Sequence, residues 1–140
     1  IKKMINTIYI EKKIKHHERT LLILSKFKNP RVIYIDSYSE IFNKKNQNFK
    51  LQKSDPSLIL AYKYKNFVLK SPKGFGIGSE KNFYFSHMYN CIYDCKYCFL
   101  QGLFSSANYL LFVNYEDFLK NINNLITKNA KKSITFFSGY

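Results

Sequence analysis

Residues 7–14 form a strand-like run of apolar and polar positions, and residues 31–36 predict a second strand. Between these runs, residues 17–27 carry leucines and a phenylalanine at the spacing of a helix. Pro30 is expected to end that helix, because proline restricts the residue before it to extended conformations. The pattern therefore predicts a small β-α-β unit near the start of the chain.

The middle of the chain is less regular. Residues 41–57 are polar and aperiodic, which predicts a surface loop whose lysines either face solvent or contact phosphates. Residues 58–72 predict a hairpin with its turn near residues 63–66. The glycines of residues 74–78 lack the spacing of a phosphate-binding loop, so they predict a flexible connector.

A second set of regular elements follows these glycines. Residues 82–88 predict an aromatic strand, residues 107–114 a short apolar strand and residues 133–137 a buried strand. Residues 115–130 predict an amphipathic helix with acidic residues in its first turn and lysines near its end, as the helix dipole favours. Strand, loop, helix and strand in this order predict a right-handed β/α unit.

These elements together predict an α/β protein in two regions. The first is an N-terminal α/β region with a hairpin over residues 1–78, and the second covers residues 79–140. No run approaches the roughly 18 apolar residues of a membrane span, and the N-terminal residues lack the apolar core of a signal peptide. We therefore expect a cytoplasmic protein with no membrane partner.

The chain carries a formal net charge of +14, which would suit an anionic partner such as nucleic acid. Only Arg19 and Arg31 are arginines among the 23 basic residues, and the lysines are scattered along the chain. Scattered lysines in a chain rich in Asn, Ile, Tyr and Phe also fit a bias in coding composition. Charge therefore supports a DNA partner without establishing one.

All three cysteines of the chain, Cys91, Cys95 and Cys98, fall within one C-x3-C-x2-C motif. In a reducing cytosol such a cluster indicates metal binding or redox chemistry rather than disulfides. On a helix the three would be small residues along one buried face. Alternatively, His87 could complete a Cys3His zinc site with them.

A third interpretation assigns a role to the missing fourth thiol. A [4Fe-4S] cluster usually takes four thiolates, so three leave one iron with an open coordination position. S-adenosyl-L-methionine can occupy that position through its amino nitrogen and carboxylate oxygen. An electron from the reduced cluster then cleaves the sulfur to C5′ bond and yields a 5′-deoxyadenosyl radical.

At these residues the chain resembles the radical S-adenosylmethionine superfamily, whose motif follows the first strand of a partial (β/α)6 barrel. The resemblance implies that residues 79–140 begin such a barrel and that the three cysteines bind the [4Fe-4S] cluster. It also implies that the aromatic Tyr97 packs near the adenine of the cofactor. The "FFSG" run, with Ser138 and Gly139, is similar to the family element that contacts the amino group of the cofactor.

A narrower resemblance is to the spore photoproduct lyase family. It is carried by the motif, by Leu100-Gln101 and Val113-Asn114, and by the β-α-β unit that precedes them. It implies a lyase for DNA repair that reverses a thymine dimer, with a reductase, flavodoxin or ferredoxin as electron donor.

Two departures concern hydrogen transfer. Phe99 stands where the family has a tyrosine, so a hydrogen relay through a hydroxyl there is excluded. The family's hydrogen-donor cysteine would lie beyond Tyr140. We expect the chain to be an N-terminal fragment that is inactive and poorly stable alone. The alternatives are a radical enzyme with a non-DNA substrate and a zinc-stabilised nucleic-acid-binding module.

Overall fold

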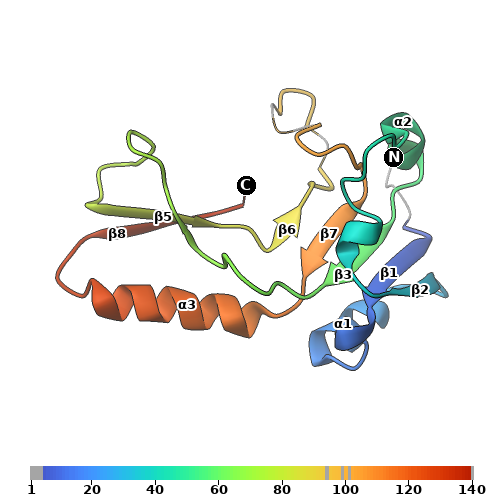
Figure 1. Ribbon diagram of the computed structural model, residues 1–140, viewed down its shortest axis with the longest axis horizontal. Coiled ribbons are helices and arrows are strands. Elements are labelled where there is room, and N and C mark those ends of the chain that lie inside the picture. The colour runs from blue at the N-terminus through green and yellow to red at the C-terminus, as the bar shows by residue number, and fades with distance from the viewer. Residues whose placement is uncertain (1–4, 94, 99, 101, 140) are drawn as a thin grey trace. The chain divides into compact units, whose positions relative to one another are not determined.

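The computed structural model describes residues 5–93, 95–98, 100 and 102–139 (Figure 1). Contacts group the chain into two compact units that alternate along the sequence. Unit 1 consists of Ile1–Tyr62 and Met88–Val113, and unit 2 consists of Lys63–His87 and Asn114–Tyr140. The division into regions 1–78 and 79–140, which the sequence suggests, stays a prediction.

Unit 1 is built on a five-stranded sheet in the order β2-β1-β3-β7-β6. Its first four strands are parallel, and β6 pairs antiparallel with β7 at one edge (Figure 1). The strands are β1 (Thr7–Glu11), β2 (Arg31–Ile35), β3 (Leu58–Ala61), β6 (Met88–Tyr89) and β7 (Tyr109–Phe112).

Short helices connect these strands. The helix α1 (Glu18–Leu24) lies between β1 and β2, and the side chain of His17 caps it by accepting a hydrogen bond from Arg19 N at 3.2 Å. The 3-10 turns η1 (Lys12–Ile14) and η2 (Tyr38–Glu40) follow β1 and β2. The strands β1 and β2 pair in parallel, and α1 lies between them in the sequence, so the predicted β-α-β unit is confirmed.

Apolar strands fill the core of unit 1. All four residues of β3 are buried, as is typical of a central parallel strand with both faces covered. Ile8 and Ile10 of β1 are fully buried, whereas Tyr9 between them is only half-buried. The core thus lies on β3 and on its two neighbours in the sheet, β1 and β7.

Unit 2 contains a three-stranded sheet in the order β4-β5-β8. The strand β5 (Lys81–Phe85) pairs antiparallel with β4 (Leu69–Lys70) and parallel with β8 (Ile134–Ser138). The helix α3 (Tyr115–Lys128) runs along this sheet (Figure 1). Its buried Phe118 packs against the rings of Phe67 and Phe85, with ring centroids 5.2 and 6.3 Å apart. The predicted α/β class and the second β/α unit, from β5 through α3 to β8, are confirmed.

Three predictions about single elements are wrong. Residues 58–72 are not a hairpin, because β3 pairs with β1 and β7 whereas β4 pairs with β5 in the other sheet. The polar segment 41–57 contains a helix, α2 (Phe49–Ser54), which begins where Asn48 Oδ1 accepts a hydrogen bond from Leu51 N at 3.1 Å. Strand β8 is only half-buried because it lies at the edge of its small sheet.

Within the described residues, no helix has both the length and the apolar character needed to cross a membrane.

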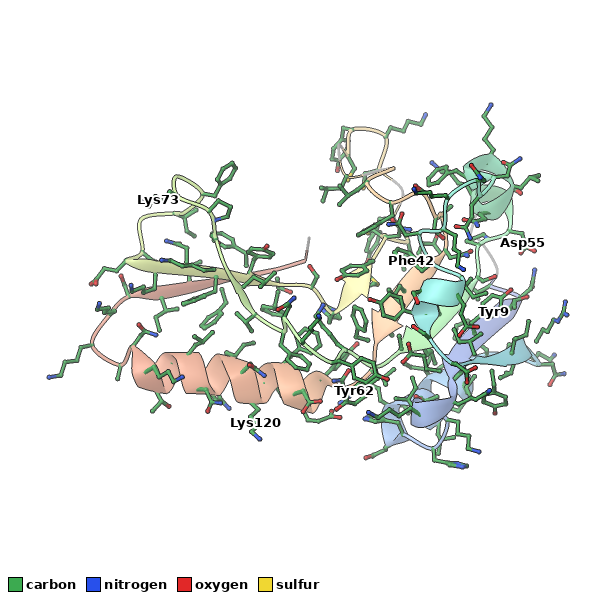
Figure 2. The ribbon with its side chains drawn as sticks, in the orientation of Figure 1. Tyr9, Phe42, Asp55, Tyr62, Lys73 and Lys120 are labelled. Carbon is green, nitrogen blue, oxygen red and sulfur yellow. The ribbon has the colours of Figure 1, made fainter. Side chains whose placement is uncertain are left out.

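Glu11 is a buried carboxylate at the end of β1, with 1% of its surface exposed. Its Oε1 accepts a hydrogen bond from Tyr38 N at 2.8 Å, and its Oε2 accepts one from Tyr62 N at 2.9 Å. These bonds join the end of β1 to the start of η2 and to the residue after β3; Tyr62 is labelled in Figure 2. Burial raises the pKa of Glu11 above its ordinary 4.5, although both hydrogen bonds and nearby Lys13 oppose that shift.

The raised pKa of Glu11 predicts a pH dependence of stability. The folded protein binds the Glu11 proton more tightly than the unfolded chain, so this group lowers the free energy of unfolding as pH rises from 4.5 through the raised pKa. Urea unfolding of wild type and Glu11→Gln from pH 4 to pH 8 measures the effect. We expect the free energy of unfolding of wild type, minus that of the variant, to decrease as pH rises. A difference that does not change with pH would contradict the raised pKa of Glu11.

Candidate cofactor site

The cysteine motif lies on the loop of unit 1 that leaves β6 and returns to β7 (Figure 1). None of the three cysteines forms a disulfide; Cys91 is exposed, and Cys95 and Cys98 are half-buried. Cys98 N donates to Cys95 O at 3.0 Å, so the second half of the motif is a tight turn. The interpretation of the three cysteines as small residues along one buried helix face is wrong, because no helix spans them among the described residues.

Asn90 closes the stem of this loop. Its Nδ2 donates to Ser106 O at 2.7 Å and to Asn108 O at 2.8 Å, across 16 and 18 residues. The backbone of Asn90 is left-handed, with φ of 61°, a conformation that asparagine adopts more readily than most residues. The residue just before Cys91 is thereby fixed to the returning chain.

Side-chain amides from residues 41–57 also hold the returning chain. Asn43 Oδ1 accepts from Ser105 N at 2.7 Å, and Gln52 Oε1 accepts from Ala107 N at 2.9 Å. Asn108 Oδ1 in turn accepts from Ser57 N at 3.0 Å. We call Asn43, Gln52, Asn90 and Asn108 the amide clamp. The sequence does not indicate this clamp, because single amides have no spacing that points to partners 16 to 62 residues away.

The donor chemistry of the loop fits an iron-sulfur cluster. Thiolates are the ligands of such clusters, and the three cysteines here are not in disulfides, lie within one short loop and have solvent access. Across residues 5–93, 95–98, 100 and 102–139, however, no three His, Cys, Asp or Glu side chains are gathered closely enough to share a metal ion. Convergence of the three thiols on one cluster therefore stays a prediction.

The other predicted cofactor contacts are exposed. Tyr97, on the loop, has 90% of its surface exposed. Ser138 ends β8 in unit 2, and Gly139 follows it with a left-handed φ of 88° while donating from its N to Phe85 O at 3.2 Å. The glycine is required there because a side chain would be strained at that φ. Phe99, Gln101 and Tyr140 lie outside the described residues.

His87, the fourth ligand in the zinc alternative, lies in unit 2. It is half-buried, and its ring meets the edge of the Tyr115 ring at 5.4 Å and 83°. Burial lowers the pKa of His87 below its usual 6.5, so the imidazole is neutral at pH 7. Packing against Tyr115 accounts for this histidine without a metal.

Asn114, part of the Val-Asn step noted in the sequence, is fully buried. Its Oδ1 accepts from Lys63 N at 2.9 Å and its Nδ2 donates to Lys63 O at 2.9 Å, as two paired strand residues would. The same Nδ2 donates to Asp117 Oδ2 at 2.7 Å in the first turn of α3. Asn114 therefore fixes the start of α3 to the chain that leaves β3.

No family model matches the sequence, and no curated protein matches it. Two solved structures are similar to the chain. One is spore photoproduct lyase complexed with dinucleoside spore photoproduct, with a TM-score of 0.65 and 17% identity over 93% of this chain. The other is a mutant of spore photoproduct lyase with bound AdoMet and dinucleoside spore photoproduct, with a TM-score of 0.65 and 16% identity over 99% of this chain.

This chain has the fold of the matched part of spore photoproduct lyase. The match covers 38% and 42% of those two structures, so the chain spans about two fifths of their length. The resemblance read from the cysteine motif and the strand pattern is thus confirmed at the level of the fold.

The amide clamp yields a prediction about the loop stem. Asn90→Gly keeps the left-handed backbone but removes two hydrogen bonds to buried acceptors, so we expect it to lower the free energy of unfolding by about 1–3 kcal/mol. Asn90→Ala should cost about 1 kcal/mol more, because alanine is strained at positive φ. Urea unfolding measures both variants.

The matched control is Asn46→Gly, an exposed asparagine with φ of 62°. We expect this change to stay within about 0.5 kcal/mol of wild type, as surface substitutions usually do. Equal effects at positions 46 and 90 would contradict the clamp.

Proposed function

We propose that this chain is part of a radical S-adenosylmethionine enzyme of the spore photoproduct lyase type, acting in the cytoplasm. The carrying observation is the C-x3-C-x2-C loop, held by the amide clamp, in a chain with the spore photoproduct lyase fold. Neither the cysteine loop nor the fold suffices alone, because one fold hosts several chemistries and a cysteine motif can bind more than one kind of metal.

In this proposal Cys91, Cys95 and Cys98 hold a [4Fe-4S] cluster, which when bound supplies the electron that cleaves S-adenosyl-L-methionine. The exposed ring of Tyr97 covers the adenine. Ser138 and the backbone of Gly139 approach the methionyl end, and the space beside the Cα of Gly139 is open. The electron comes from a reductase or from a flavodoxin or ferredoxin.

The proposed substrate is a pyrimidine photoproduct in DNA. Both solved neighbours are described with a bound dinucleoside spore photoproduct, which supports this substrate class. The net charge of +14 supports a polyanionic partner. Phenylalanine at position 99 cannot relay a hydrogen atom through a hydroxyl, so the proposed chemistry takes its hydrogen donor from elsewhere.

The metal assignment predicts which variants lose iron. Anaerobic reconstitution of the full-length protein should give about four irons per chain and the broad visible absorption of an iron-sulfur cluster. Each of Cys91→Ala, Cys95→Ala and Cys98→Ala should remove that absorption, because each deletes one of three thiolates. His87→Ala is the matched control and should keep its iron. Zinc that is lost in the His87 variant would favour the Cys3His module instead.

The substrate assignment predicts a product pair. Reconstituted full-length protein, given a chemical reductant, S-adenosyl-L-methionine and dinucleoside spore photoproduct, should form 5′-deoxyadenosine and convert the lesion to two thymidine units, as liquid chromatography would show. Formation of 5′-deoxyadenosine with the lesion unchanged would identify a radical enzyme with another substrate. Iron-loaded protein that forms no 5′-deoxyadenosine would contradict the proposed class.

A further inference from the structure

Unit 1 has a second candidate site beside the stem of the cysteine loop. It is an open pocket of about 410 Å³, a volume within the range of small-ligand sites. Its walls include Tyr38, Phe42, Tyr89 and Phe104, and Lys44 lies at its rim. Phe42, labelled in Figure 2, comes two residues after η2.

Three of these aromatic rings form a continuous apolar wall. Tyr89 and Phe104 lie 4.9 Å apart between ring centroids with their planes 31° apart, and Phe42 lies 5.0 Å from Phe104 and 6.0 Å from Tyr89. Phe112 of β7 supports the wall by meeting Tyr89 edge-on at 5.4 Å. The rings are therefore held in place from behind, and Tyr38, Tyr89 and Phe104 are only half-buried, so they present aromatic surface to the pocket.

The charge around the pocket selects the ligand. Lys44 is one of the residues that line the pocket, and it is exposed, so the pocket carries a positive charge that is accessible to solvent. Burial raises the pKa of both Tyr38 and Tyr89 above the ordinary 10, so neither phenol carries negative charge at pH 7. A flat, neutral aromatic wall next to a lysine suits a planar ring that carries a phosphate.

We propose that this pocket holds an unpaired nucleobase of a nucleic-acid strand, stacked on Tyr89 and Phe104, with the neighbouring phosphate on Lys44. Stacking on aromatic side chains combined with a cationic path for the backbone is how proteins bind single strands without reading their sequence. This site shares none of the proposed cluster ligands or cofactor contacts, although Asn43 of the amide clamp also lines it, and it needs neither iron nor S-adenosyl-L-methionine. It adds a contact to nucleic acid outside the lesion that reacts.

The test uses metal-free full-length protein and fluorescein-labelled hexathymidylate, with binding followed by anisotropy. Phe104→Leu retains an apolar side chain but removes a stacking face, so we expect binding about ten-fold weaker. Phe75→Leu is the matched control, because Phe75 is a phenylalanine with 73% of its surface exposed in unit 2 and should leave affinity within about two-fold. Circular dichroism checks that each variant is folded.

The variant Lys44→Gln tests the phosphate contact separately. Lys44 is exposed, so the substitution should not affect folding. It should reduce the slope of log affinity against log salt by about one, as expected for a single phosphate contact. An abasic hexamer with the same phosphates should compete at least ten-fold less well than hexathymidylate.

Several results would overturn the proposal. One is absence of binding to hexathymidylate, and another is equal affinity of the Phe104 and Phe75 variants. Equal competition by the abasic hexamer would show a charged surface without a base pocket, and an unchanged salt slope in Lys44→Gln would remove the phosphate contact. Because no cofactor is present, these outcomes are independent of the iron and 5′-deoxyadenosine assays.

Discussion

The parallel pairing of β7 with β3 is the interaction on which the cysteine loop depends. The register runs from Leu58 opposite Tyr109 to Ala61 opposite Phe112, and β7 thereby continues the N-terminal sheet. Strand β6 then pairs with the free side of β7. Both ends of the loop are consequently anchored on neighbouring strands of one sheet, so the loop itself can be irregular without losing its position.

Backbone pairing fixes the strands but leaves the polar groups of the loop stem to be satisfied. Ser106 and Asn108 are buried, and buried backbone groups need hydrogen-bond partners. The amide clamp supplies them, because an asparagine or glutamine offers donors and acceptors without a charge that would be costly to bury. The polar segment between residues 41 and 57, which contains α2, therefore supports the stem of the proposed cofactor loop rather than only facing solvent.

The local elements could be predicted from the sequence where periodicity decides them. The β1-α1-β2 unit and α3 follow from strand-like runs and helical spacing, and α3 also has Glu116 and Asp117 in its first turn. Partner choice could not be predicted in the same way. The run at residues 58–61 is equally apolar whether it forms a hairpin or a central parallel strand, and only long-range pairing with β1 and β7 separates the two. The clamp and the aromatic pocket join residues that are distant in sequence, so neither leaves a local pattern.

The proposed ligands and their supports differ in burial, and this difference follows from their tasks. Cys91 and Tyr97 are exposed and Cys95 and Cys98 half-buried, which leaves these side chains accessible to a cluster and a cofactor that must enter from solvent. Glu11, Asn108 and Asn114 are buried, and each bonds the main chain of a distant segment. A buried polar group that is fully bonded fixes one arrangement of the chain, because any alternative would leave it unpaired in a low-dielectric interior. Positioning of the site therefore rests on polar residues that do not themselves contact the proposed cofactor, and the exposed motif is free to adopt the geometry that ligation requires.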